Sequence, residues 1–149
     1  MAVKVLAVAS RGGHWVQLLR LRDALESADV TYVTTVSGYR SMVGAARLRV
    51  VCEANRHQKL RMVWLAVQMA WIVLRERPQV IVTTGAAPGF LAIRFGRLLG
   101  AKTLWLDSIA NAEELSMSGR LAAAHADVVL TQWEHLDGAC GAQFRGAVI

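Results

Sequence analysis

The chain has 149 residues, with 17 Lys and Arg against 11 Asp and Glu and a formal net charge of +6. This length predicts one domain that buries about 70% of its unfolded surface, so folding requires neither disulfides nor a structural metal. The two cysteines, Cys52 and Cys140, lack the spacing of a zinc site or a redox pair, which is typical of a reducing compartment. No signal-peptide pattern precedes the first apolar run, so we expect a cytoplasmic protein.

Short β-branched runs alternate with helical patterns along the chain. We predict strands at 3–9, 30–36, 48–52, 79–83, 102–107 and 127–131. We predict helices at 15–27, 39–46, 58–77, 88–99 and 118–125. Pro88 suits a first helical turn, and Gly100 suits a helix end. Strict alternation predicts an α/β fold with a Rossmann-like doubly wound parallel sheet, in a single domain over 1–149.

The segment after Trp133 contains several glycines and shows no clear period. We expect it to be loosely ordered or reserved for a partner.

A glycine-rich turn, Ser10-Arg11-Gly12-Gly13-His14, joins the first predicted strand to a helix. Backbone N–H groups at such a helix start bind phosphate or diphosphate, because they lie at the positive end of the helix dipole. A second glycine-rich turn at 84–89 follows the fourth predicted strand. Ligands of doubly wound sheets bind outside the carboxyl ends of the strands. We therefore expect the two turns to cradle a diphosphate, with a further contact from Arg11.

Missing motifs exclude several common sites. The first turn lacks G-x-G-x-x-G, and the second strand ends without the acidic residue that would hold a ribose, which argues against a nicotinamide or flavin domain. G-x-S-x-G, G-x-x-x-x-G-K-[ST] and H-E-x-x-H are also absent, which removes the commonest hydrolase, NTPase and zinc-protease sites. There is no Asp-x-Asp pair for a nucleotide-bound metal, and we expect no metal and no cofactor.

The apolar stretch 62–74 has basic residues at both ends, among them Arg61 and Arg75. A bilayer span needs roughly 20 apolar residues, so we expect no crossing. Trp64 and Trp71 lie two helical turns apart and share a face. The stretch is either a crossover helix buried against the sheet or a helix that also presents tryptophan to a membrane or partner, and both can hold on different faces.

The positive charge suits anionic membranes, phosphate-bearing lipids and nucleic acid alike. No nucleic-acid-binding motif is present, and we expect no nucleic-acid partner.

Five segments, taken in order, resemble one protein family. They are Ser-x-Gly-Gly-His at 10–14, Arg-Pro at 77–78 after the long apolar helix, Val-Ile-Val-Thr-Thr-Gly-Ala at 80–86, Asp-Ser-Ile-Ala at 107–110, and Ala-Asp-Val-Val-Leu-Thr-Gln-Trp-Glu at 126–134. Together they resemble the PssD-type polysaccharide biosynthesis glycosyltransferase subunits. These are bacterial relatives of the membrane-associated subunit of the dolichol pathway's second N-acetylglucosamine transferase.

The resemblance implies a GT-B glycosyltransferase divided between two chains. This chain would be the amino-terminal, acceptor-side half, and a separate subunit would bind the donor. Together they would transfer a sugar from a UDP-sugar to a polyprenyl-diphosphate-linked saccharide, with this chain peripheral on the inner face of the cell membrane. The alternative is a non-catalytic subunit that recruits the catalytic chain to the membrane and presents the lipid acceptor.

The resemblance also implies roles for individual residues. It places His14 near the acceptor phosphates and the reacting hydroxyl, either as a general base or as a residue that only orients the turn. Asp107 is the second catalytic candidate, although relatives carry Glu at this position and the shorter carboxylate reaches less far. Asn111, Glu113 and Glu114 are alternative polar partners.

The predicted acceptor- and phosphate-binding residues are Ser10, Arg11, Gly12, Gly13, Thr84, Gly85, Gly89, Ser108 and Asn111. Gly85 and Gly89 either shape the acceptor site or serve only a structural turn. The predicted membrane or partner contacts are Arg61, Trp64, Trp71 and Trp133. Trp133 is equally consistent with docking of the partner chain and with core packing.

Overall fold

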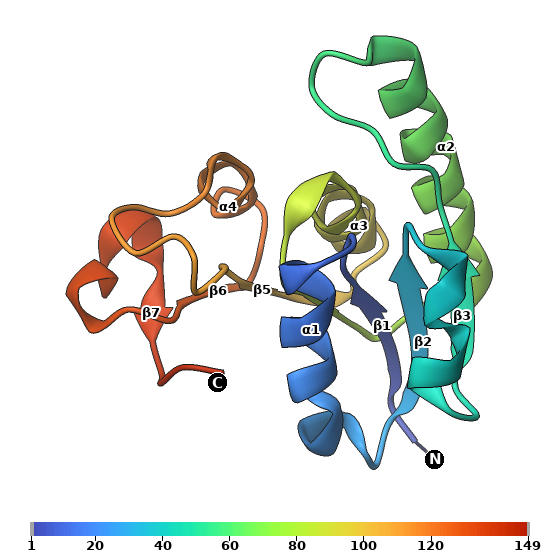
Figure 1. Ribbon diagram of the computed structural model, residues 1–149, viewed down its shortest axis with the longest axis horizontal. Coiled ribbons are helices and arrows are strands. Elements are labelled where there is room, and N and C mark those ends of the chain that lie inside the picture. The colour runs from blue at the N-terminus through green and yellow to red at the C-terminus, as the bar shows by residue number, and fades with distance from the viewer. Residues whose placement is uncertain (1, 149) are drawn as a thin grey trace.

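The computed structural model describes residues 2–148. These residues form one sheet of seven parallel strands (Figure 1). The strands are β1 (Lys4–Val8), β2 (Asp29–Thr34), β3 (Arg47–Val50), β4 (Val80–Thr83), β5 (Lys102–Leu106), β6 (Val128–Thr131) and β7 (Gln143–Phe144). Their order in the sheet is β3-β2-β1-β4-β5-β6-β7. The predicted Rossmann-like doubly wound parallel sheet is confirmed.

Helices cover both faces of the sheet. The α-helices are α1 (Gly13–Arg20), α2 (Lys59–Glu76), α3 (Ala86–Leu98) and α4 (Met117–Ala122). Short 3-10 helices form η1 (Arg22–Leu25), η2 (Ser37–Val43), η3 (Glu134–Leu136) and η4 (Ala139–Gly141). One core contains buried residues of α2, α3 and α4, and a smaller core contains those of α1 and η2.

Strand β1 lies between the two cores and shows why the sequence folds in this way. Its Leu6 and Val8 side chains join the core of α2 and α3, whereas Ala7 joins the core of α1. Successive strand residues point to opposite faces, so a continuous apolar run is required where both faces are covered. The small alanine side chain leaves room for Trp15 of α1, which is 1% exposed.

Three predicted helices differ from the structure in type or by more than two residues in extent, and one of them, predicted at 118–125, is α4, which ends at Ala122. The predicted helix 15–27 is divided into α1 and η1, because the hydrogen bonds from Leu21 N to Leu18 O and from Ala24 N to Leu21 O have the shorter 3-10 spacing. The predicted helix 39–46 is the 3-10 helix η2. Pro88 lies in the first turn of α3, as predicted.

The segment after Trp133 is more ordered than predicted. β7 pairs with β6, with Phe144 opposite Thr131. The Phe144 amide donates to Asp137 Oδ1 at 2.9 Å, and the Val148 amide donates to Gln132 Oε1 at 2.8 Å. The expectation of loose order is therefore wrong for the described residues. These hydrogen bonds join residues 7 and 16 positions apart, and the sequence has no periodic pattern that would predict such pairs.

The Asp127 carboxylate links the amino-terminal ends of β5 and β6 and supplies a pH-dependent contribution to stability. Its Oδ2 accepts hydrogen bonds from Thr103 N at 2.9 Å and from Thr103 Oγ1 at 3.2 Å. The backbone hydrogen bond from Thr103 lowers the pKa of Asp127 below its ordinary value of 3.8. A carboxyl whose pKa is lowered in the folded state stabilises the fold above its unfolded pKa, and this stabilisation is lost as the pH falls through the folded pKa.

We predict that Asp127→Asn lowers the free energy of unfolding at pH 7 by less than about 1 kcal/mol, because solvent screens a partly exposed carboxylate. The difference from the wild type should shrink as the pH falls below the ordinary carboxyl pKa of 3.8. Urea denaturation at pH 7 and at the lowest pH where the protein stays folded measures both values. An equal difference at the two pH values would contradict the prediction.

Candidate functional site

The two glycine-rich turns meet where the strand order of the sheet reverses. β1 and β4 are neighbours, with Val8 opposite Thr83 at their carboxyl ends. β1 continues into α1 on one face, whereas β4 continues into α3 on the other. The connections diverge at this point and leave the crevice in which doubly wound sheets bind ligands. The structure therefore brings the two predicted turns together.

His14 connects the two turns through a pair of hydrogen bonds. Its ring Nδ1 lies 3.0 Å from the backbone oxygen of Thr84, and the Thr84 hydroxyl donates to the backbone oxygen of His14 at 2.5 Å. A carbonyl oxygen only accepts, so Nδ1 carries the proton in this contact. In the neutral ring Nε2 then presents a lone pair, and no residue within 2–148 forms a hydrogen bond with it.

Glycine is required at positions 85 and 89 because other parts of the chain lie too close for a side chain. A Cβ atom on Gly85 would lie 2.8 Å from His14 Nδ1, and its φ of 134° favours glycine. A Cβ atom on Gly89 would lie 2.1 Å from Thr83 Oγ1, the atom that accepts a hydrogen bond from Gly85 N at 3.1 Å. Gly85 thus allows His14 to lie against the second turn, and Gly89 allows α3 to lie against Thr83. The contact of either glycine with an acceptor stays a prediction.

Hydrogen bonds to residues of β2 and η2 hold the first glycine-rich turn in place. The Thr34 hydroxyl donates to the Ser10 backbone oxygen at 3.2 Å, and the Gly12 amide donates to Tyr39 Oη at 3.2 Å. The Tyr39 ring stacks on Trp15, with centroids 4.9 Å apart. No side chain of the described residues caps α1, and the first turn of this helix contains no acidic residue. Its first backbone N–H groups, including that of Gly13, are therefore available to an anion.

Arg11 and Arg61 line the same polar hollow at the ligand edge, by which we mean the edge of the sheet formed by the carboxyl ends of its strands. Arg11 Nε lies 3.2 Å from Glu53 Oε1, and both side chains are exposed. The hollow has a volume of about 350 Å³, and Asn55 and Gln58 also line it. Arg61 was predicted as a membrane or partner contact, and the structure places it beside the first turn. Two guanidinium groups against the one carboxylate of Glu53 leave the hollow with a net positive charge, which favours an anionic ligand.

The Asp107 side chain is 2% exposed and organises the connection after β5. Its Oδ1 accepts from Trp105 Nε1 at 3.0 Å and from Ser116 Oγ at 2.6 Å. Its Oδ2 accepts from Ser116 N at 2.9 Å and from Asn111 Nδ2 at 3.3 Å. Two carboxylate oxygens offer about four acceptor positions. This geometry favours a positioning role for Asp107, and direct participation in chemistry stays a prediction.

Sequence analysis did not identify the buried polar network beside this connection. Gln17 Nε2 donates to Ser108 Oγ at 3.2 Å. Gln132 Nε2 donates to Gln17 Oε1 at 2.5 Å and to the Asp107 backbone oxygen at 3.0 Å. The available signal was an uncharged polar residue in α1 one turn after His14, among apolar neighbours. Both amides are nearly inaccessible, so they hold the site together rather than contact a ligand directly.

Trp133 lies on the ligand edge, as predicted, and contacts the connection after β5. Its Nε1 donates to the Ile109 backbone oxygen at 2.7 Å, and its ring is half-buried. Its contact with a partner chain stays a prediction. Within residues 2–148, no three His, Cys, Asp or Glu side chains gather as the ligands of a metal ion would.

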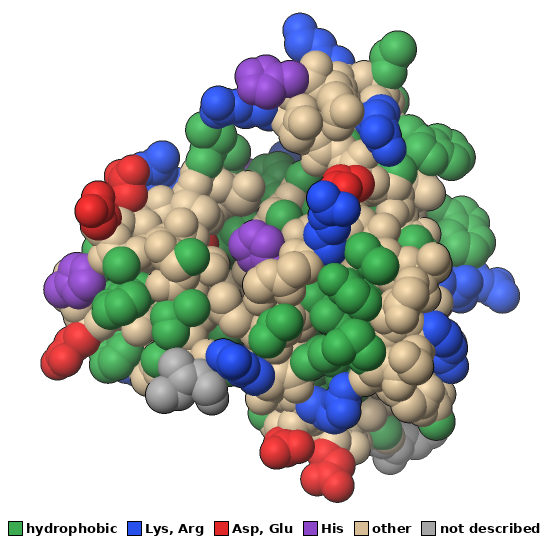
Figure 2. Space-filling model, in the orientation of Figure 1, with side chains coloured by type: hydrophobic (Ala, Val, Ile, Leu, Met, Phe, Trp, Pro, Cys, Tyr) green, Lys and Arg blue, Asp and Glu red, His purple; other side chains and the backbone are tan. Residues whose placement is uncertain are grey.

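α2 has two apolar faces. One buries Leu65, Met69, Ile72 and Val73 in the core. The other exposes Leu60, Val63, Trp64, Val67, Trp71 and Leu74, and Trp64 and Trp71 are 56% and 55% exposed. Figure 2 shows apolar side chains next to Lys and Arg at the edge where α2 lies in Figure 1. None of the described helices combines the length and apolarity needed to cross a bilayer.

Residues 34–148 match the protein family described as "Oligosaccharide biosynthesis protein Alg14 like". The chain belongs to this Alg14-like family. A curated relative, the UDP-N-acetylglucosamine transferase subunit ALG14 of Eremothecium gossypii, is 26% identical across 89% of this chain and 73% of its own length.

The Alg14-like chain is similar in structure to parts of larger proteins whose structures have been solved. MurG from Acinetobacter baumannii has a TM-score of 0.77 at 13% identity, over 95% of this chain and 45% of MurG. UDP-N-acetylglucosamine 2-epimerase from Rickettsia bellii has a TM-score of 0.69 at 12% identity, over 91% of this chain and 40% of its own. The chain thus spans less than half of each protein and has the fold of one half of a GT-B glycosyltransferase. Because an epimerase shares this half, the fold alone does not determine the reaction.

We predict that Gly85→Ala lowers the free energy of unfolding by about 2–4 kcal/mol, because it adds a clash with His14 to backbone strain. Gly100→Ala is the matched control, since Gly100 has a φ of 82° and no atom of residues 2–148 lies within 4 Å of the added Cβ. This control should lose only about 1 kcal/mol. Urea denaturation measures both losses. Equal losses would show that the His14 ring does not press on the second turn.

Proposed function

We propose that this Alg14-like chain is, as a single domain, the acceptor-side half of a glycosyltransferase formed by two chains. The partner chain binds a UDP-sugar, and the acceptor is a polyprenyl-diphosphate-linked saccharide. Membership of the family and the fold of one GT-B half support this proposal. The Eremothecium gossypii relative is a subunit of a UDP-N-acetylglucosamine transferase, so UDP-N-acetylglucosamine is the first donor to test.

The observation that carries the proposal is His14 Nε2, which forms no hydrogen bond with any described residue. Nδ1–H bonds to the Thr84 carbonyl, and this fixes both the ring and its tautomer. An acceptor hydroxyl oxygen held at Nε2 attacks the anomeric carbon of the donor sugar, and the bond from that carbon to the UDP oxygen breaks with inversion. The hydroxyl proton passes to Nε2, and UDP leaves with the bonding electron pair. A positioned base of this kind contributes about 10²–10⁴-fold to the rate.

The surrounding residues divide into ligand-binding and positioning groups. The first-turn amides of α1 and the Arg11 guanidinium hold the acceptor diphosphate. Thr84 and Asn111 donate hydrogen bonds within the chain, so they position His14 and Asp107 rather than bind the acceptor. Ser108 is 8% exposed and receives a hydrogen bond from Gln17, and it fixes the wall of the site on the β5 side.

The second candidate function is a non-catalytic subunit that recruits the catalytic chain and presents the lipid acceptor. The exposed apolar face of α2 favours this alternative, because such a face suits an anchoring surface. The commitment of Asp107 to hydrogen bonds within the chain also favours it. The role of His14 separates the two functions.

We predict that His14→Asn lowers kcat of the two-chain enzyme by at least about 100-fold, because it removes the base Nε2. The Asn side-chain amide retains a donor near the position of Nδ1, so the bond to Thr84 and the free energy of unfolding should be preserved. Transfer of labelled sugar from UDP-N-acetylglucosamine to a polyprenyl-diphosphate acceptor measures kcat. Val16→Ala is the matched control, since Val16 is an exposed residue of the same helix.

Co-purification of the two chains must be measured for each variant. Loss of transfer with intact association and stability supports the split enzyme. Full transfer by His14→Asn contradicts catalysis by His14 and favours the scaffold.

We further propose that the exposed face of α2 contacts the inner surface of the cell membrane. Tryptophan side chains favour the boundary between apolar and wet surroundings, and the neighbouring Lys59 and Arg61 suit anionic headgroups. The combined variant Trp64→Ser with Trp71→Ser should weaken binding to vesicles that contain anionic lipid by at least about tenfold. Sedimentation with vesicles measures the change. Leu121→Ser, a change of a 55% exposed residue on α4, is the control, and an equal loss there would contradict the proposal.

A further inference from the structure

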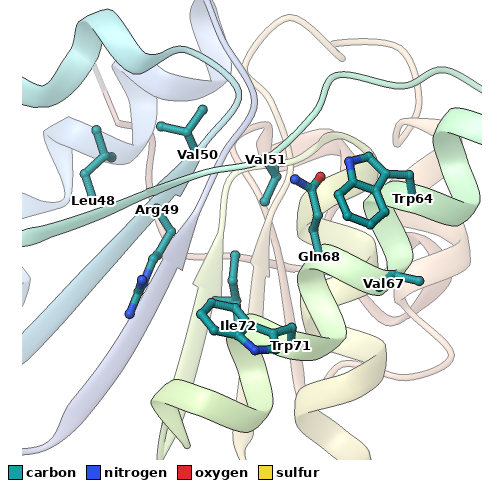
Figure 3. A pocket seen from close by; sticks show the side chains of 9 residues that line it. All are labelled: Leu48, Arg49, Val50, Val51, Trp64, Val67, Gln68, Trp71 and Ile72. Atoms are coloured by element: carbon teal, nitrogen blue, oxygen red, sulfur yellow. The ribbon is translucent and has the colours of Figure 1, made fainter.

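A groove of about 500 Å³ runs between the edge strand β3 and α2 (Figure 3). Its deepest lining residues, Val51 and Ile72, are each 3% exposed. Trp64 and Trp71 line it at two levels of α2, two helical turns apart. The volume lies within the range of about 300–1,000 Å³ that is typical of small-molecule sites.

The polar residues of the groove bond to neighbouring protein groups. Arg49 Nη2 lies 2.7 Å from Glu76 Oε1, and its Cζ lies 5.5 Å from the centroid of the Trp71 ring. Gln68 Oε1 accepts a hydrogen bond from Cys52 N at 2.8 Å. The surface that remains for a ligand is therefore mainly apolar. A ligand that fills it gains from burial of hydrocarbon rather than from hydrogen bonds.

The lining residues of the groove lie close in the chain to those of the polar hollow, on both walls. On α2, Arg61 of the hollow precedes Trp64 of the groove by three residues, which is about one helical turn. On the other wall, Val51 of the groove is followed by Glu53 of the hollow. A ligand with an anionic end beside Arg11 and Arg61 can therefore extend its apolar end along α2.

We propose that this groove holds the first isoprene units of the acceptor's prenyl chain while the diphosphate lies beside Arg11 and Arg61. The identity of the ligand as a prenyl diphosphate rests on the proposed function. The distribution of charge favours this occupant over an apolar peptide. Arg11 and Arg61, opposed by the single carboxylate of Glu53, leave a net positive charge at one end of an apolar groove, and this complements an anionic head joined to a hydrocarbon tail. The prenyl chain thereby contributes to acceptor recognition in addition to membrane anchoring.

Binding of prenyl diphosphates of increasing length to the full chain tests this inference. The probes are inorganic diphosphate and geranyl, farnesyl and geranylgeranyl diphosphate, each below its micelle-forming concentration, in isothermal titration calorimetry. We expect Kd to fall by about tenfold for each added isoprene unit, because each unit buries further hydrocarbon. The Kd for inorganic diphosphate gives the contribution of the head alone, and Arg61→Gln should raise it.

Two matched variants test whether the prenyl chain lies in the groove. Val67 lines the groove and is 53% exposed, whereas Val63 is outside the lining, four residues away on the same helix, and is 62% exposed. Val67→Glu should abolish the dependence of Kd on chain length and leave the Kd for inorganic diphosphate unchanged. Val63→Glu should retain the dependence. Both positions are exposed, so both variants should fold, and circular dichroism checks this.

Three results would overturn the inference. They are a wild-type Kd that does not change with chain length, equal effects of Val63→Glu and Val67→Glu, and no binding of any prenyl diphosphate. The transfer assay with the partner chain is independent of these titrations. Sugar transfer without a length dependence would refute the groove and leave the proposed function standing, whereas a length dependence without transfer would refute the proposed function and leave prenyl binding standing.

Discussion

The close contact between His14 and the turn after β4 is the constraint on which the ligand edge depends. β1 and β4 diverge into helices on opposite faces, and within residues 2–148 the backbone joins their connections beyond Thr83 only by a long hydrogen bond from Thr84 N to Val8 O at 3.4 Å, so a firmer link must come from side chains. The hydrogen bonds between His14 and Thr84 supply that link, and the absence of a side chain on Gly85 makes it sterically possible. The position of α1 is thereby fixed relative to the second turn.

Hydrogen bonds from α1 also hold the connections that follow β5 and β6, in the other half of the sheet. Gln17 lies one turn after His14 and bonds to Ser108 and Gln132, and Gln132 also accepts from the amide of Val148. A buried amide that loses a partner retains its full desolvation cost, so each bond of this network makes the others harder to break. Three connections at the carboxyl edge are therefore held relative to one helix.

This arrangement explains which parts of the molecule could be predicted from sequence. The strands were predictable because β-branched runs such as 80–83 are buried on both faces and interrupted by glycine turns. The shared face of Trp64 and Trp71 on α2 was predictable from their seven-residue spacing, whereas the sequence left open whether that face is exposed. β7 was not, because two residues carry no period and their pairing with β6 is decided by tertiary contacts. The burial of Gln17 was hidden for the same reason, since its partners lie 91 and 115 positions away.

The open edge of the sheet explains why the proposed reaction needs a second chain. Glycosyl transfer from a UDP-sugar competes with hydrolysis, so the reacting atoms must be shielded from water. In this chain His14 is only half-buried, and Arg11 beside it has a 64% exposed side chain. A sheet with helices on both faces has already used those faces for its own cores, so it cannot close its carboxyl edge by itself. The proposed donor-binding chain would close this edge, and the base at His14 would then act only in the assembled enzyme.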